Sequence, residues 1–382
     1  MKTCRFKYTF KIILVFTILL AMIFPSSCGK KQSGTVEVKD QEIIHDLEYG
    51  GVFVKLKIDD FHDMGFKYGD SLDISFSNGL ELKDLPYYND YIAKTGEYFV
   101  IGYPDYKYIK IIICNGGDFW PESGLTEDDK ASVSLNEAGK YVKIQEAMDL
   151  KRDDDRSHFP DDETFANFRE ITAGNIKPKT LYRSSSPHID QIGRAEFTDE
   201  LLDKYNIKTI INLSESKAEL KEALNDDDFD APNMKDIYED GNVKNHKTNM
   251  NYKSEEFRDV AIEAIKDISI SDGPYLIHCK LGKDRTGIIC FLLEALCGAT
   301  YEEAADDYMK TYENLYGLSK TEDKEKYDII KENVFDDIVK LIVTEDSENY
   351  ETADLSKYAR DYFLEGGMTE DEINRVIEKL SD

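Results

Sequence analysis

The alternation of apolar and polar positions along the chain predicts a β-rich region followed by an α/β region. Between residues 41 and 145, short stretches such as "GVFVKLKIDD" and "GDSLDISFSNGLEL" alternate with a period of two and are separated by Gly, Asn and Asp. Period-two alternation bounded by turn residues is typical of half-buried strands. The pattern therefore predicts a small β-rich domain, a barrel or a sandwich, over residues 41–145.

The pattern changes after a charged segment at residues 146–163, which Pro160 interrupts and which we expect to be an acidic linker. Over residues 164–382, buried-strand runs such as "DGPYLIHC" alternate with helical runs such as "SEEFRDVAIEAIKDIS" and "GIICFLLEALC". Such alternation is typical of a central sheet covered by helices. We therefore expect an α/β domain at residues 164–382.

The first 28 residues have the pattern of an export signal. A basic stretch precedes the uncharged run at residues 12–24, which is shorter than the roughly 20 residues that span a bilayer. The end of this segment, Ser26-Ser27-Cys28, resembles a bacterial lipobox, although Pro25 stands where Leu is usual. We expect a lipoprotein-type signal peptide at residues 1–28, acylation of Cys28, a tether at residues 29–40, and an exported protein anchored by lipid to the outside of the cell membrane. Plain secretion and an uncleaved anchor are the alternatives.

The charge composition bears on which partners the protein can bind. Asp and Glu number 77 against 48 Lys and Arg, for a formal net charge of −29, which argues against a nucleic-acid partner. No cysteine or histidine spacing matches a metal site, so we expect neither a metal nor a cofactor. Cys114, Cys290 and Cys297 lie in apolar runs and are interpreted as core residues. Cys279 alone has an unusual neighbourhood.

That neighbourhood is "HCKLGKDRTG", residues 278–287. A buried strand leads to Cys279, Gly282 allows a tight turn, and an apolar helix follows. A strand–loop–helix of this kind turns successive backbone N–H groups and a helix N-terminus toward one point, which suits a phosphate dianion. The same environment should stabilise the thiolate of Cys279. Arg285 can bind two phosphoryl oxygens at once, so the segment indicates phosphoryl transfer through a phosphocysteine.

The segment resembles the signature loop of the protein tyrosine phosphatase superfamily, and its "KDRTG" ending is similar to the bacterial tyrosine/serine phosphatase family. Two upstream stretches agree with that family, "NFREI" (residues 167–171) and "LYRSSSPH" (residues 181–188), and so do the C-terminal helices. The resemblance covers about residues 165–380 and excludes the β-rich region. One departure is "INLSES" (residues 211–216), where the family typically has Asp-Leu-Arg.

The resemblance implies roles for individual residues. Cys279 would be the nucleophile and Arg285 the phosphate clamp, while His278 would tune the thiolate and Thr286 would donate a hydrogen bond to its sulfur. Asp284 would be the general acid, with Asp236 and Asp240 as alternatives. The remaining substrate-binding candidates are Lys280, Leu281, Gly282, Lys283, Gly287 and Arg183. For Arg183, a structural hydrogen-bonding role is the alternative.

The expected function is hydrolysis of phosphotyrosine, with phosphoserine and phosphothreonine as further substrates. Paired lysines, Lys280 and Lys283, resemble those of phosphoinositide phosphatases, so a phosphoinositide or inositol-polyphosphate phosphatase is the alternative. A rival of another class is a phosphate-binding or surface-binding module without turnover. The pattern identifies no ligand for the β-rich region.

Overall fold

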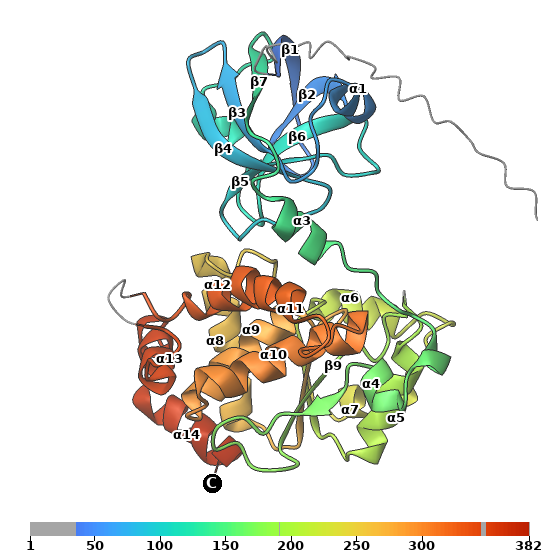
Figure 1. Ribbon diagram of the computed structural model, residues 1–382. Coiled ribbons are helices and arrows are strands. Elements are labelled where there is room, and N and C mark those ends of the chain that lie inside the picture. Colours follow the sequence, from blue (N-terminus) through green and yellow to red (C-terminus); the bar gives the residue numbers. More distant parts are fainter. Residues whose placement is uncertain (1–35, 191, 345–348, 382) are drawn as a thin grey trace, which may run out of the picture. The chain divides into compact units, whose positions relative to one another are not determined.

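The computed structural model describes residues 36–190, 192–344 and 349–381 (Figure 1). The expected signal peptide, with Cys28, therefore lies outside the described residues. Strands β1 to β7 belong to the first region: β1 (Glu37–His45), β2 (Val52–Lys57), β3 (Ser71–Phe76), β4 (Glu81–Tyr88), β5 (Tyr98–Ile101), β6 (Tyr108–Ile113) and β7 (Lys130–Glu137). They close into a barrel in the order β1-β2-β6-β5-β4-β3-β7. The prediction of a β-rich domain is confirmed.

Alternation of side chains explains why these strands close around a core. In β2, Val52, Val54 and Leu56 are buried, whereas Lys55 and Lys57 are exposed. One face of the strand therefore contributes to the barrel interior and the other faces solvent. The first strand begins at Glu37, inside the segment expected to be a tether, because it pairs with both β2 and β7.

Three short helices accompany the barrel and the segment that follows it: α1 (Ile58–Asp63), α2 (Trp120–Ser123) and α3 (Val142–Met148). The acidic segment after α3 contains the short η1 (Arg156–His158) and leads into α4 (Asp162–Phe165). It packs onto the α/β domain, because the buried guanidinium of Arg194 donates a hydrogen bond to the carbonyl of Asp153.

The α/β domain has a five-stranded sheet in the order β11-β10-β12-β9-β8. Its strands are β8 (Arg169–Glu170), β9 (Leu181–Ser184), β10 (Thr209–Asn212), β11 (Val243–Asn245) and β12 (Tyr275–His278). All neighbouring pairs are parallel except β8 and β9. The carboxyl ends of β9, β10 and β12 lie level, because His278 pairs with both Asn212 and Ser184.

Helices cover both faces of this sheet (Figure 1). They are α5 (Ala195–Lys204), α6 (Lys217–Ala223), α7 (Pro232–Glu239), α8 (Glu255–Ile270), α9 (Asp284–Leu296), α10 (Tyr301–Tyr316), α11 (Lys324–Ile330), η2 (Lys331–Phe335), α12 (Asp336–Val339), α13 (Leu355–Glu365) and α14 (Glu370–Ser381). Ile211 and Ile277 point to the core that contains α8, α9 and α10, whereas Ile210 and Leu276 point to the core that contains α5 and α7. The predicted α/β fold is confirmed.

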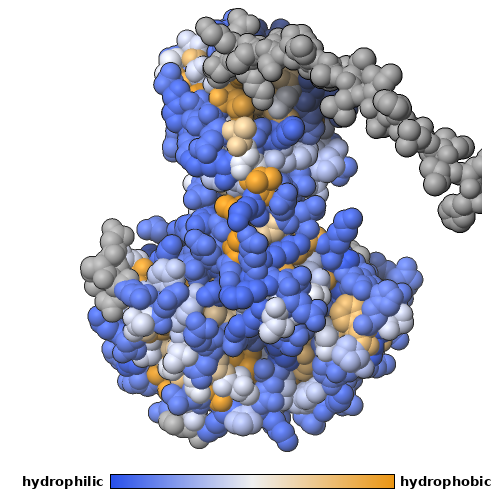
Figure 2. Space-filling view, viewed as in Figure 1, coloured by the Kyte–Doolittle hydropathy of each residue, from blue (hydrophilic) through white to orange (hydrophobic). Residues whose placement is uncertain are grey.

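Helix α9 lies in the larger core and is apolar on every side. Its residues from Thr286 to Leu296 are all buried, which explains the nearly continuous apolar sequence "GIICFLLEAL". By contrast, the face of the protein in Figure 2 is mainly hydrophilic, with hydrophobic residues in separate patches. Among the described residues, no helix is both long enough and apolar enough to span a membrane.

Candidate active site

The segment singled out in the sequence connects the central strand β12 to the N-terminus of α9. His278 ends the strand and is fully buried, and Cys279 follows at 3% exposure. Gly282 has a φ of +66°, and a Cβ atom there would lie 2.2 Å from the carbonyl oxygen of Ser184. Only glycine fits this position, because it has no Cβ and accepts positive φ. The residue therefore sets the tight return of the loop toward α9.

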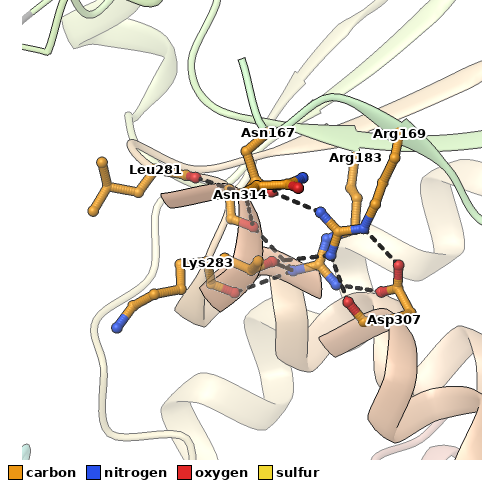
Figure 3. A network of polar contacts seen from close by, with 9 residues as sticks. Asn167, Arg169, Arg183, Leu281, Lys283, Asp307 and Asn314 are labelled. Carbon is orange, nitrogen blue, oxygen red and sulfur yellow. Dashed lines mark hydrogen bonds and ion pairs between the residues drawn. The ribbon is translucent and has the colours of Figure 1, made fainter. Parts of the chain in front are cut away.

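The backbone carbonyls of the loop bind donors on its outside. Asn167 Nδ2 donates to the carbonyl oxygens of Leu281 and Gly282, at 3.1 Å and 3.3 Å (Figure 3). Arg183 Nη2 donates to those of Gly282 and Lys283, at 2.9 Å and 3.3 Å. The carbonyl of Lys280 accepts from the backbone N–H of Ser186 at 3.2 Å.

This outer set of hydrogen bonds determines where the N–H groups of the loop point. In a trans peptide the C=O and the N–H point in opposite directions. With the carbonyls of residues 280–283 directed outward, the N–H groups of residues 281–284 are directed into the loop. Together with the N-terminus of α9, they form a concave group of donors suited to an anion.

A buried ionic network holds the donors themselves. Arg183, at 1% exposure, binds Asp307 with its Nη1 at 2.5 Å, and Arg169 binds the other oxygen of Asp307 at 2.7 Å (Figure 3). Burial opposes the charge of Asp307, but Arg169 and Arg183 hold the pKa of its carboxyl well below the ordinary value. Asn167 accepts hydrogen bonds from Arg169 and Asn314 at 2.7 Å and 3.2 Å. Every member of the network thus has a partner.

Arg183 does not lie where the first of its two expected roles would require. We expected it to line the substrate mouth or to make structural hydrogen bonds, and it lies beneath the loop in contact with loop carbonyls. The sequence pattern did not indicate Asp307 or Asn314, because both lie on α10, outside the segment that contains Cys279. Asn167 and Arg169 belong to the "NFREI" stretch, which the family resemblance had marked without a role.

Arg285 is held by the loops that follow β10 and β11. Its Nη1 donates to the carbonyl oxygens of Leu213 and Thr248, at 2.9 Å and 3.3 Å. A guanidinium has five N–H donors, so others remain for an anion. The departure from the family pattern at residues 212–214 therefore leaves a carbonyl contact intact, because the contact uses the backbone of Leu213.

His278 and Thr286 lie on either side of Cys279 in the chain, and both are fully buried. Burial, reinforced by His188, lowers the pKa of His278 to about 3, so its imidazole is neutral at ordinary pH. Its Nδ1 lies 3.4 Å from the carbonyl oxygen of Cys279. Within the described part of the chain, the hydroxyl of Thr286 has no hydrogen-bond partner. A buried hydroxyl without a partner is costly, so this one is available to the sulfur or to a ligand.

Lys283 points away from the anion-binding loop. Its ammonium group lies 3.1 Å from Asp284 Oδ1 and 5.2 Å and 5.9 Å from the ring centres of Tyr312 and Tyr316. Burial opposes its charge, but Asp284 and the tyrosines raise the pKa of Lys283 well above the ordinary value. The side chain that we expected to bind substrate is thus held by α10 and by its own neighbour.

The three candidate general acids occupy different places. Asp284 is the first residue of α9, with its side chain 35% exposed. Asp236 and Asp240 are exposed residues of α7 and its C-terminal end, before β11. The loop after β11, residues 246–254, provides the Thr248 carbonyl that binds Arg285 but contains no Asp or Glu. Of the three, Asp284 alone shares the segment of Cys279.

The other expected contacts are backbone or packing contacts. Leu281 and Gly282 contribute carbonyls to the outer hydrogen bonds and N–H groups to the interior. Gly287 lies in the first turn of α9, where a Cβ atom would lie 2.5 Å from the ring of Tyr308. His188, which follows β9, pairs with Glu215, which follows β10, at 2.7 Å. This contact between His188 and Glu215 lies at the same edge of the sheet as Cys279.

Comparisons with known proteins give one family match and weak structural matches. The catalytic core of the PP-IP phosphatase SIW14 from S. cerevisiae, solved with citrate, is 21% identical over 47% of this chain and 91% of its own length, with a TM-score of 0.27. A second structure of the Siw14 catalytic core is 17% identical over 46% and 95%, with a TM-score of 0.24. No curated protein matches the chain. A family model described as "Tyrosine phosphatase family" matches residues 142–382, which include Cys279 and exclude the barrel.

Proposed function

The chain belongs to the tyrosine phosphatase family and is a cysteine-dependent phosphatase, and from that premise we propose that it hydrolyses phosphotyrosine, with phosphoserine and phosphothreonine as further substrates. One observation carries the proposal. The carbonyls of residues 280–283 all bind donors outside the loop, which leaves N–H groups directed inward beside Cys279. Such a group of donors supports binding of a phosphoryl group next to a thiolate.

The proposed reaction has two steps. In the first, Cys279 Sγ attacks phosphorus, the bond from phosphorus to the leaving oxygen breaks, and Asp284 gives its proton to that oxygen. In the second, water gives a proton to Asp284 and its oxygen attacks phosphorus. The S–P bond then breaks, and inorganic phosphate and the thiolate are released. The site returns to its starting protonation state.

The neighbouring residues have supporting roles in this proposal. Arg285 and the inward N–H groups bind the equatorial oxygens, and more strongly as charge develops on them. The free hydroxyl of Thr286 donates to the sulfur when the thiolate leaves in the second step. Neutral His278, behind Cys279, fixes the strand end without adding charge. Asn167 and Arg183 act on the substrate only through the loop and are positioning residues.

The alternative, an inositol-polyphosphate substrate, depended on two lysines that could contact further phosphates. Lys283 is engaged by Asp284 and by the rings of α10, which favours the phosphotyrosine proposal. Lys280 remains as a candidate contact for any phosphate ester. The activity test below therefore includes inositol substrates, so that it can decide between the two substrate classes.

We also propose, from the sequence of residues 1–28, that the protein is exported and carries lipid on Cys28. Metabolic labelling with a radioactive fatty acid should label the wild-type protein and leave Cys28→Ala unlabelled. Equal labelling of the two would contradict lipidation at this residue.

The activity test is phosphate release by the purified protein and by Cys279→Ser. The substrates are a phosphotyrosine peptide, a phosphoserine peptide, phosphatidylinositol 3-phosphate and phytate. The proposal expects release that depends on Cys279 and is fastest with the phosphotyrosine peptide. A preference for the inositol substrates would move the function to the alternative, and no release dependent on Cys279 would leave a binding module.

A further inference from the structure

The barrel and the α/β domain are connected by a helix that packs on both. In α3, Ile144 packs against the barrel cluster that contains Tyr88 and Phe99, whereas Ala147 belongs to the core of the α/β domain. Gln145 is 7% exposed and exchanges two hydrogen bonds with Asn89 of the barrel, at 2.6 Å and 3.0 Å. The chain from residue 36 onward forms one compact unit. The barrel loop that starts at Asn89 is thus tied to the α/β domain.

That loop reaches a cavity beside Asp284. The cavity has a volume of about 100 Å³. On one side it is lined by Ile92, Ala93 and Lys94 of the barrel, and on the other by Asp284, Tyr308 and Tyr312. The two domains therefore share the wall of one cavity, and the carboxylate next to the anion-binding loop belongs to that wall.

The position of Asp284 suggests what this cavity binds. A proton donor must lie within hydrogen-bond reach of the leaving oxygen, so the group that leaves must occupy space beside it. We propose that barrel residues 91–95 form one wall of the leaving-group site, and that the barrel thereby binds phosphopeptide substrates. The inference rests on the proposed function, since it takes Asp284 as the proton donor.

The chemistry of the wall fits a phenol ring. Tyrosine rings from α10, together with Ile92 and Ala93, present aromatic and apolar surface, which stacks well on a phenol. A polyphosphorylated inositol ring would place several charged groups against the same surface, where Lys283 is already paired with Asp284 and Lys94 is the other lysine of the lining. Desolvating such charges without partners is costly. The wall therefore favours an aryl leaving group.

A larger hollow continues from the same three barrel residues along β4. It has a volume of about 630 Å³ and shares Ile92, Ala93 and Lys94 with the smaller cavity. Six consecutive residues of β4, from Glu81 to Pro86, line it. Consecutive residues of a strand point to opposite faces. Because all six residues line the hollow, the hollow must lie along the edge of the strand.

The edge of β4 is open along the hollow. In the described residues, β4 pairs with β5 only at Tyr87 and Tyr88, while its earlier residues pair with β3 alone. An extended peptide can add to an open strand edge through backbone hydrogen bonds. A phosphopeptide with its tyrosine ring beside Asp284 would continue past Ala93 into this hollow.

Binding to the inactive Cys279→Ser protein tests the inference separately from turnover. The dissociation constant of an extended phosphotyrosine peptide is measured by fluorescence anisotropy in this background, alone and combined with Ala93→Trp, Lys94→Glu or Lys107→Glu. Ala93→Trp fills the shared wall and Lys94→Glu reverses its charge, so each should weaken binding about tenfold or more, which is about 1.4 kcal/mol. Lys107→Glu makes the same charge change on an exposed part of the barrel that lines neither hollow, and should leave the constant unchanged.

Thermal unfolding of each variant separates loss of binding from loss of fold, and Lys94→Glu decides the question if Ala93→Trp does not fold. Unchanged binding in the folded wall variants would overturn the inference, whatever the activity of the wild-type protein. If the wall variants weaken binding but the wild-type protein releases no phosphate, the barrel contributes to phosphopeptide binding and the proposed phosphatase function is wrong.

Discussion

The loop at residues 279–285 has one side that faces the core of the domain and one that faces solvent, which we call its inner and outer sides. On the inner side its carbonyls contact buried donors, whereas on the outer side it ends in a partly exposed ion pair. Asn167 and Arg183 bind the loop carbonyls on this side. Arg183 is held in turn by Asp307, and Asn167 by Arg169 and Asn314. The outer side consists of Lys283 and Asp284 against tyrosine rings. The geometry for phosphate is therefore fixed from the interior, while the side facing the leaving group is open to solvent and to the barrel.

The largest expected effect comes from breaking the inner side at Arg183. Arg183→Met leaves Asp307 with one buried cation and removes donors from two loop carbonyls. Removing one partner of a buried pair costs about 3–5 kcal/mol. The free energy of unfolding in urea should fall by that amount, and phosphatase activity should be lost.

The matched control is Lys143→Met, which breaks an exposed pair with Glu325. It should leave the unfolding curve where it is. If Arg183→Met unfolded like the wild-type protein, the buried network would not support the loop.

His278, also on the inner side, should make stability depend on pH. Its folded pKa of about 3 lies below its ordinary value of 6.5 because of burial and His188. Between these two values the unfolded chain binds a proton that the folded chain does not. The free energy of unfolding should therefore fall as pH is lowered from 6.5 toward 3, by up to about 1.4 kcal/mol per pH unit from this residue.

Urea denaturation at a series of pH values, for the wild-type protein and His278→Gln, checks this expectation. The difference between the two curves isolates His278 from the carboxyl groups that titrate in the same range. The variant should have the flatter dependence, and parallel curves would show that the imidazole is not held neutral.

A substitution of Asn167 separates the loss of hydrogen bonds to the loop from the loss of a buried charge, because the side chain is an uncharged donor. Asn167→Ala leaves the carbonyls of Leu281 and Gly282 without that donor and should cost about 1–3 kcal/mol in the free energy of unfolding. Because the loop N–H groups lose their fixed direction, kcat/KM should fall about tenfold. Asn314→Ala is the control, since Asn314 binds Asn167 but not the loop. Equal loss in both variants would place the effect in general packing rather than in the loop.

The smallest expected effect is on the outer side. Lys283→Met removes a partly exposed ion pair, and such pairs are worth about 1 kcal/mol or less. Activity on a phosphotyrosine peptide and on phytate should change by the same modest factor. A selective loss on phytate would mean that Lys283 leaves Asp284 and binds a substrate phosphate.

The sequence predicted the parts of the site that are local. The strand before Cys279, the turn at Gly282 and the apolar helix that begins at Asp284 follow from one continuous stretch, residues 275–296, and the structure has all three. The direction of Lys283 could not be predicted, because the rings that hold it belong to α10. A lysine near an anion-binding loop is expected to point inward unless distant residues provide a better site.

The same reason applies to the rest of the inner side. Asp307 is one acidic residue among several on a helix with regular apolar spacing, and nothing in its surroundings marks it as buried. Its role depends on the tertiary placement of α10, which brings Asp307 to Arg169 of β8 and Arg183 of β9. In the β-rich region, the strands could be predicted but their arrangement could not. Period-two alternation predicted strands, while closure of the barrel depends on β1 pairing with β7 across most of that region.

A phosphocysteine intermediate is tested by a search for phosphate bound to Cys279. The protein is mixed with a phosphotyrosine peptide, quenched in acid, digested and analysed by mass spectrometry, with Asp284→Asn as a variant in which hydrolysis of the intermediate should slow. We expect one phosphoryl group on the peptide that contains Cys279, formed and lost more slowly in Asp284→Asn because Asp284 acts in both steps. Phosphate release without that adduct, or undiminished release by Cys279→Ser, would contradict a phosphocysteine mechanism.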